Sequence, residues 1–355
     1  LTSSMLDVIT EIAELVGHVN ATAGLSTNPM LRRTNRIRTI YSSLAIEQNT
    51  LSLDQVTAVL DGKRVLAPPK DIAEVKNAYE IYEMMDSLNP YSVDDLLNAH
   101  AVMTRGLTVE SGCFRSGPVG VVDKQGNILH FGTLPDYAPG LTSELLGWVK
   151  DSNIHMLIKS CVFHYELELI HPFSDGNGRI GRLWHTLLLT QWKPMFAWLP
   201  VESIIHNRQD EYYAAINRSN YEGESTVFIE FMLSAIKEAL MEAVQTTRQQ
   251  KISRQIQRDI AEILQKEGQA ISNGAMITVT TVRVSPDFAY AKVYFSIFPF
   301  TRNEEIMASL EKNNWFIRRE LGKRIRNQLK IVPELQFFLD DSLEYIENID
   351  SLLKE

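Results

Sequence analysis

The stretch His171-Pro-Phe-Ser-Asp-Gly-Asn-Gly-Arg-Ile-Gly-Arg182 organises the first two thirds of this chain. An apolar run over 167–170 leads into it, and the proline at its second position ends that run. Two glycines flanking an asparagine come next, just before an apolar run over 180–189 that predicts a helix. Glycines let backbone N–H groups approach a ligand closely, and a helix N-terminus favours negative charge. The stretch therefore predicts a phosphate site beside a histidine.

The charged residues of this stretch support the same interpretation. Arg179 and Arg182 are three apart at the start of the predicted helix, so they share one face and both can bind phosphate oxygens. Asp175 is a hard carboxylate of the kind that holds Mg²⁺ beside a nucleotide. A glycine turn before a helix is usually only a turn, and a lone histidine is usually structural. The combination of all these residue types favours a transferase.

The same stretch resembles the Fic family signature, His-Pro-Phe-x-Asp/Glu-Gly-Asn-Gly-Arg-x-x-Arg, and every fixed position is present. The resemblance implies a mainly α fold, a Fic-type helical bundle with a β-hairpin flap. It also implies an enzyme that moves AMP from ATP to a Ser, Thr or Tyr hydroxyl of a protein. In that reaction His171 is the catalytic base, and Asp175 holds Mg²⁺ beside ATP. The residues that bind the phosphates are then Gly176, Asn177, Gly178, Arg179 and Arg182.

A second segment bears on regulation. Ser43 and Glu47 are four apart, hence one turn apart on one side of a predicted helix. In many Fic proteins a segment Ser/Thr-x-x-x-Glu-Gly/Asn inhibits the enzyme, and its glutamate pairs with the last arginine of the signature. The resemblance thus implies that Glu47 faces Arg182 and blocks the ATP γ-phosphate. The family's small residue after the glutamate is replaced by Gln48 here, and a plain surface glutamate is the alternative.

Two further regions complete the expected site. Residues 114–135 predict a β-hairpin with a turn at Asp123-Lys-Gln-Gly126. Its position matches the family's flap, on which the target protein docks by adding its main chain as an extra strand. By family register the nucleotide is bordered by His130, Phe131, Gly132 and Thr133, and its adenine by Tyr212, Tyr213 and Asn220. A structural histidine at 130 and a buried structural tyrosine pair are the alternatives.

The chain changes character after residue 245. From Arg248 onward it holds 16 Lys and Arg against 15 Asp and Glu, whereas the preceding part has a net charge of −10. Apolar patterning predicts the order helix, strand, strand, helix, strand, a small α+β domain with helices on one face of its sheet. Domains at 1–245 and 246–355 are therefore expected. A predicted helix over 318–330 is rich in cations that suit a phosphate backbone, namely Arg318, Arg319, Lys323, Arg324, Arg326 and Lys330.

This tail resembles ribosome-binding factor A, a maturation factor of the bacterial small subunit with a KH-like fold. The matching runs are Gln250-Lys-Ile-Ser-Arg, Val284-Ser-Pro-Asp, Tyr290-Ala-Lys-Val, Phe316-Ile-Arg-Arg-Glu-Leu-Gly-Lys-Arg and Val332-Pro-Glu-Leu. The resemblance implies binding to the 30S subunit or its 16S rRNA. At one place the family has an Ala-x-Gly interruption and this chain has Asn313-Asn314-Trp315, so a tryptophan replaces the residue that gives backbone freedom.

The overall composition limits the remaining functions. No run of apolar residues is long enough for a membrane span, and no export leader is evident, so a cytoplasmic protein without a membrane partner is expected. The two cysteines, Cys113 and Cys161, are too few for a disulfide framework. The oligomeric state is not readable from the sequence, and a homodimer stays open.

Two alternatives to an autoinhibited protein adenylyltransferase also stay open. The chain could be an RNA-binding ribosome-assembly protein whose Fic domain is silent. It could instead be a Fic enzyme that removes AMP or uses another nucleotide donor.

Overall fold

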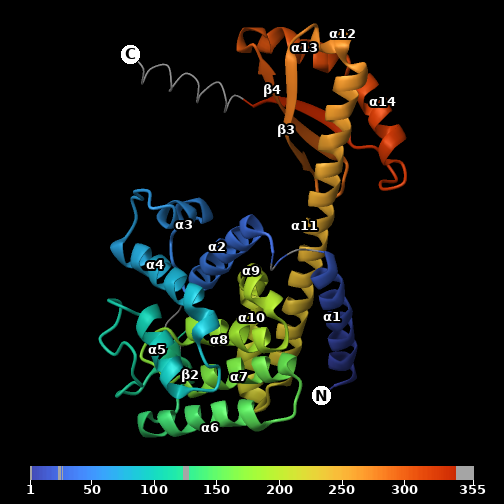
Figure 1. Ribbon diagram of the computed structural model, residues 1–355. Coiled ribbons are helices and arrows are strands. Elements are labelled where there is room, and N and C mark those ends of the chain that lie inside the picture. The colour runs from blue at the N-terminus through green and yellow to red at the C-terminus, as the bar shows by residue number, and fades with distance from the viewer. Residues whose placement is uncertain (1, 23–24, 26, 123–127, 341–355) are drawn as a thin grey trace. The chain divides into compact units, whose positions relative to one another are not determined.

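The computed structural model describes residues 2–22, 25, 27–122 and 128–340, and side chains between 121 and 130 are outside the description. The chain divides into two compact units, Leu1–Ala243 and Val244–Glu355. The first is almost entirely helical and the second combines helices with a small sheet (Figure 1). This is the expected fold class, and it is confirmed.

The first unit is a succession of helices. In order they are α1 (Ser3–Thr22), α2 (Pro29–Ile46), α3 (Leu53–Leu60), α4 (Pro69–Met84), α5 (Val93–Met103), α6 (Ala138–Asp151), α7 (Met156–Ile170), α8 (Asn177–Trp192), α9 (Val201–Asn207), α10 (Gln209–Glu222) and the first part of α11 (Thr226–Glu267). Short 3₁₀ helices lie at Met85–Ser87, Pro135–Tyr137 and Pro194–Trp198. A longer segment between α5 and α6 holds the hairpin.

The core of this unit is built around α8. Ile180, Leu183, Trp184 and Leu187 recur at helical spacing and are buried, so one whole face of the helix is apolar. The same core takes side chains from α2, α4, α5, α6 and α7. Because α8 is held on several sides, its N-terminus is fixed in position, and the site described below is built there.

The expected hairpin lies between α5 and α6. Strands β1 (Gly120–Val122) and β2 (Ile128–Phe131) pair antiparallel, with Gly120 opposite Phe131. The expected turn at Asp123–Gly126 lies outside the described residues. The base of the hairpin is tied to the end of α7, because the Thr133 N–H and hydroxyl both donate to the Ile170 carbonyl, at 3.2 and 3.1 Å.

The second unit contains one sheet. Its elements are the rest of α11, α12 (Gln269–Ser272), β3 (Met276–Val284), β4 (Tyr290–Phe298), a 3₁₀ turn at Phe300–Arg302, α13 (Asn303–Lys312), α14 (Asn314–Ile325) and β5 (Glu334–Leu339). The strand order is β3-β4-β5, antiparallel then parallel. Apolar side chains of α11, α13 and α14 pack with those of the strands into one core. The predicted order of elements is confirmed.

Three features of these helices bear on the sequence prediction. The helix α11 runs without a break from Thr226 to Glu267, past residue 245 where the chain changes character. The cationic helix expected over 318–330 ends at Ile325, so Arg326 and Lys330 lie in the loop that follows. The interruption between α13 and α14 forms without glycine, since Asn313 adopts φ −101° and ψ 11°, which any residue can reach. Of the helices that the structure describes, none is both long and apolar enough to span a bilayer.

Candidate active site

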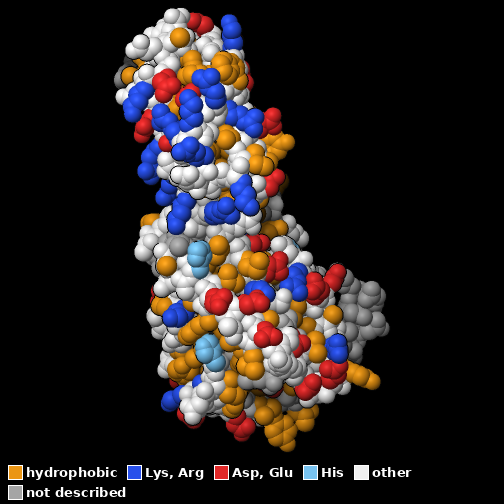
Figure 2. Space-filling view, turned by 90° about the vertical axis from the view of Figure 1, so that its right-hand side faces the viewer, with side chains coloured by type: hydrophobic (Ala, Val, Ile, Leu, Met, Phe, Trp, Pro, Cys, Tyr) orange, Lys and Arg blue, Asp and Glu red, His pale blue; other side chains and the backbone are white. Residues whose placement is uncertain are grey.

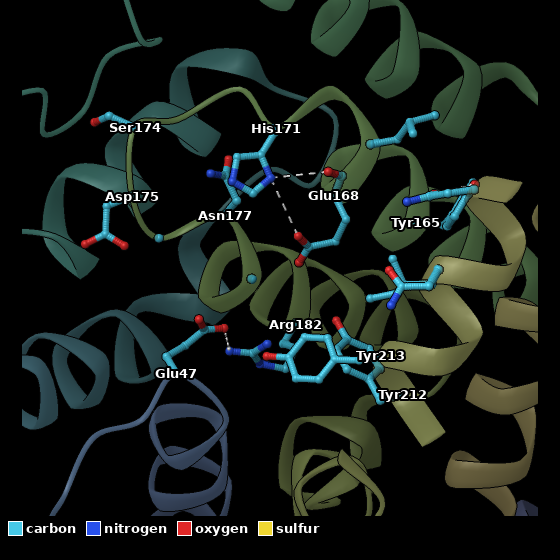
Figure 3. Close-up of a pocket in the computed structure, with 16 residues that line it drawn as sticks. Glu47, Tyr165, Glu168, His171, Ser174, Asp175, Asn177, Arg182, Tyr212 and Tyr213 are labelled. Carbon is cyan, nitrogen blue, oxygen red and sulfur yellow. Dashed lines mark hydrogen bonds and ion pairs between the residues drawn. The ribbon is translucent and has the colours of Figure 1, made fainter. Parts of the chain in front are cut away.

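A pocket opens at the N-terminus of α8, where α2, α7 and α10 meet (Figure 3). The end of α7 supplies His171 and Glu168, the glycine turn supplies 174–178, and Arg182 lies one turn into α8. Glu47 enters from the end of α2. The sequence-predicted residues on this pocket are Glu47, His171, Asp175, Gly176, Asn177, Gly178, Arg182, Tyr212, Tyr213 and Asn220.

His171 occupies the C-cap of α7 in a left-handed conformation, with φ 52° and ψ 60°. This conformation is unusual for a residue other than glycine. It is held from both sides: the His171 N–H donates to the Leu167 carbonyl at 2.9 Å, and the His171 carbonyl accepts from Arg115 Nε at 2.7 Å. The ring Nδ1 lies 3.3 Å from the Glu168 carbonyl oxygen, which can only accept. A neutral imidazole in this position therefore carries its proton on Nδ1 and its lone pair on Nε2.

The turn before α8 requires glycine for two reasons. Gly176 has φ +88°, and a β-carbon there would lie 2.9 Å from Thr104 Cγ2. A β-carbon on Gly178 would collide with the Glu47 carboxylate. No side chain caps the helix at Gly176. The first N–H groups of α8 thus face the pocket, and they suit an anion.

Arg182 is held by the segment that the sequence singled out. Its Nη2 lies 2.7 Å from Glu47 Oε1, its Nε donates to Ser43 Oγ at 3.1 Å, and Nη2 also donates to the Ser43 carbonyl at 3.0 Å. The Arg182 side chain is 1% exposed, whereas that of Glu47 is 34% exposed and lines the pocket. The pairing of Glu47 with Arg182 is therefore present in the folded chain.

The residue after Glu47 resolves the departure from the family pattern. Gln48 takes φ 67°, the left-handed conformation that a glycine or asparagine adopts more easily. The helix α2 thus ends at Ile46 with Glu47 as its C-cap, although the residue that follows is long. Asn49 then fastens the chain, since its Nδ2 donates to Glu74 Oε2 at 2.8 Å and to the Asp71 carbonyl at 3.2 Å.

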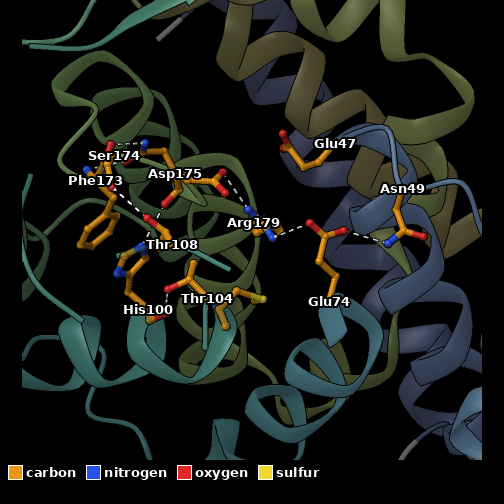
Figure 4. A network of polar contacts seen from close by, with 12 residues as sticks. Glu47, Asn49, Glu74, His100, Thr104, Thr108, Phe173, Ser174, Asp175 and Arg179 are labelled. Atoms are coloured by element: carbon orange, nitrogen blue, oxygen red, sulfur yellow. Dashed lines mark hydrogen bonds and ion pairs between the residues drawn. The ribbon is translucent and has the colours of Figure 1, made fainter. Parts of the chain in front are cut away.

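Arg179 differs from its prediction, because it does not line the pocket. Its side chain is 3% exposed and lies between two carboxylates, 2.8 Å from Asp175 Oδ1 and 3.4 Å from Glu74 Oε1 (Figure 4). In this arrangement both Nη groups of the guanidinium face carboxylates of the protein. Burial raises the pKa of Asp175, but Arg179 and the Gly176 N–H outweigh it and hold that pKa below its usual value. Arg179 therefore fixes an ionised carboxylate at the pocket rim.

The amide of Asn177 is also already bonded. Its Oδ1 accepts from the Phe173 N–H at 2.9 Å and its Nδ2 donates to the Phe173 carbonyl at 2.8 Å. Both ends of the side chain therefore close the loop 173–177 onto itself. A phosphate would meet the backbone of this loop before it meets the Asn177 side chain.

The residues expected around adenine come together at the α10 side of the pocket. Tyr212 is buried, and its hydroxyl lies 3.1 Å from His164 Nε2. Tyr213 is 37% exposed and presents part of its ring to the pocket. Asn220 Oδ1 accepts from the Tyr165 hydroxyl at 2.9 Å. Tyr212 thus has a structural role whatever the ligand, and Tyr213 offers the more accessible ring.

The described flap residues lie beside the site but do not line the pocket. Phe131 is 65% exposed on β2, and Thr133 binds the end of α7. A β-carbon on Gly132 would lie 3.0 Å from His171 Cβ, so the flap base touches the histidine. The His130 side chain lies outside the described residues.

Three residues that position the site were not predicted. The first is His100, which is buried and stacks on Phe173 with ring centroids 3.8 Å apart. Its Nδ1 accepts a hydrogen bond from the Gly112 N–H, so the ring proton is on Nε2, which donates to the Asp175 carbonyl at 2.9 Å. Arg115 is buried and donates to the carbonyls of His171, Gly117 and Thr133. Glu168 is the third, and its spacing of three from His171 at the end of a helix was the signal that could have identified it.

Glu168 is the most perturbed acid of the pocket. Burial and, to a smaller extent, the nearby Glu47 carboxylate raise its pKa to about 7, and Arg182 opposes this increase. Its carboxylate lies 4.0 Å from His171 Nδ1 and 3.8 Å from His164 Nε2. Two carboxylates and two histidines therefore surround the anion-binding end of α8.

The predicted cations of the second unit are partly neutralised. Arg319 and Lys323 pair with Glu320, at 3.0 and 2.7 Å, and Arg324 pairs with Glu262 at 3.2 Å. Arg318 donates to the carbonyls of Val332 and Pro333. Within the described chain, Arg326 and Lys330 have no ion pair. Figure 2 shows the Lys and Arg side chains gathered on one face of this unit.

Comparison with known proteins agrees with this division. The Fic/DOC family model matches residues 90–189 and the model of ribosome-binding factor A matches 248–353. A crystal structure of a Fic family protein from Desulfovibrio desulfuricans G20 is 46% identical, covers 74% of this chain and 80% of its own, and superposes with a TM-score of 0.68. Fic-1 from Caenorhabditis elegans shares the fold, at 21% identity over 69% of this chain and 72% of its own, with a TM-score of 0.54.

Sequence relatives fall into the same two groups. Ribosome-binding factor A of Flavobacterium psychrophilum is 45% identical over 112 residues, 31% of this chain and 85% of that protein. Protein adenylyltransferase fic-1 of Caenorhabditis elegans is 29% identical over 243 residues, 64% of this chain but only 44% of that protein. The chain belongs to the Fic family through its first unit and to the ribosome-binding factor A family through its second.

The pKa of Glu168 predicts a pH-dependent stability difference. A folded pKa of about 7 against an ordinary 4.5 means that the folded protein holds this proton more tightly. Through this group the free energy of unfolding therefore falls as the pH rises from about 4.5 to about 7, and is constant above that. The difference in the free energy of unfolding between Glu168→Gln and wild type should therefore shift by roughly 2–3 kcal/mol in favour of the variant from pH 5 to pH 8, at about 1.4 kcal/mol per pKa unit. Urea unfolding at both pH values measures this, and a pH-independent difference contradicts it.

Proposed function

We propose that the first unit is a protein adenylyltransferase, which moves AMP from ATP to a Ser, Thr or Tyr hydroxyl of a target protein. One observation carries the proposal: His171 stands at the rim of the pocket formed by the uncapped N-terminus of α8 and Arg182. Sequence relatives of this unit are named protein adenylyltransferases, which supports the same reaction. An anion cradle with a base at its edge suits the transfer of a phosphate-linked group.

The chemistry follows from the positions of these groups. The target hydroxyl gives its proton to Nε2 of His171 and its oxygen attacks the α-phosphorus of ATP. The bond to the β-phosphate oxygen breaks, and pyrophosphate leaves. Because Nδ1 is bonded to the Glu168 carbonyl, Nε2 is the nitrogen that can accept the proton. The N–H groups of Asn177 and Gly178 stabilise charge on the α-phosphate, while the Gly176 N–H binds the Asp175 carboxylate. Arg182 binds the terminal phosphates once Glu47 releases it.

The residues present fit a magnesium ion held together with the nucleotide. Mg²⁺ is usually bound by one or two carboxylates plus substrate phosphates and water, rather than by a cage of protein ligands. Asp175 is ionised, 46% exposed and oriented by Arg179, so its carboxylate would hold the ion at the pocket rim. No cluster of three or more ligating side chains exists among the described residues. When bound, Mg²⁺ supplies positive charge to the phosphate oxygens.

We also propose that Ser43 and Glu47 inhibit this reaction. Arg182 is bonded to both of them, and the Glu47 carboxylate lies over Gly178, where the phosphates would enter. A carboxylate at this place repels the triphosphate and occupies the guanidinium that would align it. Four further points are proposals as well: domains at 1–245 and 246–355, docking of the target on the flap, a cytoplasmic location, and homodimerisation.

For the second unit we propose binding to the RNA of the small ribosomal subunit. Six cations lie on α14 or in the loop after it, namely Arg318, Arg319, Lys323, Arg324, Arg326 and Lys330. The relatives of this unit are named ribosome-binding factor A. Arg326 and Lys330, which have no ion pair among the described residues, should contribute most, because the other four would first lose existing contacts. The two units would then combine protein modification with ribosome binding.

The adenylylation proposal predicts a ranked set of activities. With labelled ATP, Mg²⁺ and lysate, Glu47→Gly should transfer more label than wild type because Arg182 becomes available to the phosphates. His171→Ala should lose about 100-fold or more, the range of a general base. Intact-mass analysis of Glu47→Gly after incubation with ATP should show addition of about one AMP.

His206→Ala is the matched control, since this histidine lies outside the pocket and its loss should leave transfer unchanged. Label transfer that persists in His171→Ala excludes the mechanism. Equal transfer by wild type and Glu47→Gly excludes Glu47 as the inhibitor. Co-sedimentation with 30S subunits without any transfer from ATP would favour the silent-enzyme alternative, and another donor or AMP removal would appear as a different mass change.

The RNA proposal predicts a salt dependence. For single-stranded RNA, the logarithm of the binding constant should fall with the logarithm of salt concentration by about 0.7 per phosphate contact. The double variant Arg326→Gln/Lys330→Gln should reduce that slope by roughly 1.4, which corresponds to two contacts. Lys312→Gln on α13, outside the predicted surface, should leave it unchanged. A slope that is equal in all three proteins would contradict the proposed surface.

A further inference from the structure

Trp315 is a large apolar side chain with no evident structural purpose. It lies in the first turn of α14 and is 64% exposed. An indole that is exposed to water adds little to a packed core, and exposed tryptophans commonly contact a binding partner. It stands where the family has the glycine of its Ala-x-Gly interruption, yet the helix break forms at Asn313 without it. The tryptophan is therefore not needed to shape the backbone.

The indole forms one wall of a shallow hollow on the surface of the second unit. Helical spacing puts Arg318, Arg319 and Gly322 on the same side of α14 as Trp315. The hollow is lined by these residues together with Ile331 and Val332. Gly322 leaves its floor open, since a β-carbon there would already lie 3.0 Å from Val332 Cγ2. Ile331, 74% exposed, provides an apolar surface on the opposite side.

The surroundings of the hollow are cationic. The Arg319 guanidinium carbon lies 5.3 Å from the centre of the Trp315 ring. Arg318 ties the segment after α14 in place, through 2.9 and 3.1 Å hydrogen bonds to the carbonyls of Val332 and Pro333. Arg326 and Lys330 follow in the loop that leads to Ile331. A flat apolar surface bordered by positive charge matches a nucleotide, whose base is planar and whose phosphate is negative.

We propose that this hollow binds one unpaired nucleobase of RNA, stacked on the Trp315 indole, while its neighbouring phosphates lie against Arg326 and Lys330. The proposal rests on the proposed RNA binding of the second unit and adds a specific contact to it. Stacking on an aromatic side chain needs a base that is out of a helix, so the site should select single-stranded segments, loops or bulges. We favour RNA over a protein partner because a planar ring bordered by cations matches both the base and the phosphates of a nucleotide.

The test uses the full chain and fluorescence anisotropy with labelled 12-nucleotide oligouridylate and oligoadenylate, and with a 12-base-pair RNA duplex. Trp315→Ala should weaken binding to both single strands by about 5- to 150-fold, the range of one lost stacking contact. It should leave the salt slope and the duplex affinity unchanged. Trp315→Phe should retain most of the affinity. Phe298→Ala is the control, since Phe298 is an exposed aromatic at the end of β4.

The outcomes separate this contact from RNA binding in general. Salt-dependent binding of wild type that is equal in Trp315→Ala overturns the stacking site and leaves the RNA function standing. If Trp315→Ala weakens the affinity for single strands and duplex equally, or lowers the melting temperature of the protein, the indole has a structural role and the stacking site is also overturned. Loss of 30S co-sedimentation without any change on naked RNA would identify a protein contact instead. Failure of wild type to bind any RNA rejects the RNA function itself.

Discussion

The arrangement of the first unit depends on the burial of one arginine. The Arg182 side chain is 1% exposed, its charge is balanced by Glu47 at 2.7 Å, and Ser43 accepts two of its hydrogen bonds. A buried guanidinium that loses its partner destabilises a protein by about 3–5 kcal/mol, so something negative must always face it. The end of α2 supplies that charge in the folded chain. Under the proposed function, the terminal phosphates of ATP would be the other anion at Arg182, in place of the Glu47 carboxylate.

Other residues of the site fix the loop between α7 and α8 and the segment after α2. His100 and Arg115 fix the loop between α7 and α8 from outside the pocket, one through the Asp175 carbonyl and the other through the His171 carbonyl. Arg179 is buried between Asp175 and Glu74, and Glu74 in turn binds Asn49, just beyond Glu47. The signature loop and the segment after α2 are thus connected by a continuous set of polar contacts from Asp175 to Asn49 (Figure 4).

Features set by local spacing could be predicted from the sequence. The glycine turn, the helix after it and the position of His171 follow from residues within one stretch, and the Ser43–Glu47 spacing placed both on one side of α2. The partners of Arg179 and His100 could not be predicted, because Glu74 and Asp175 lie 105 and 75 residues away in the chain. The end of α14 at Ile325 was missed because its cations continue past the helix, and charge pattern carries no stop signal there.

The central claim is that Glu47 and the nucleotide compete for Arg182. Its most direct measurement is the ATP affinity of two proteins by titration calorimetry, both carrying His171→Ala to prevent turnover, one of them with Glu47→Gln. The account predicts about 10-fold tighter ATP binding for the Glu47→Gln protein, which corresponds to about 1.4 kcal/mol. The exposed substitution Glu211→Gln in the same background should leave the affinity unchanged. Equal ATP affinity with and without the Glu47 carboxylate would contradict the account.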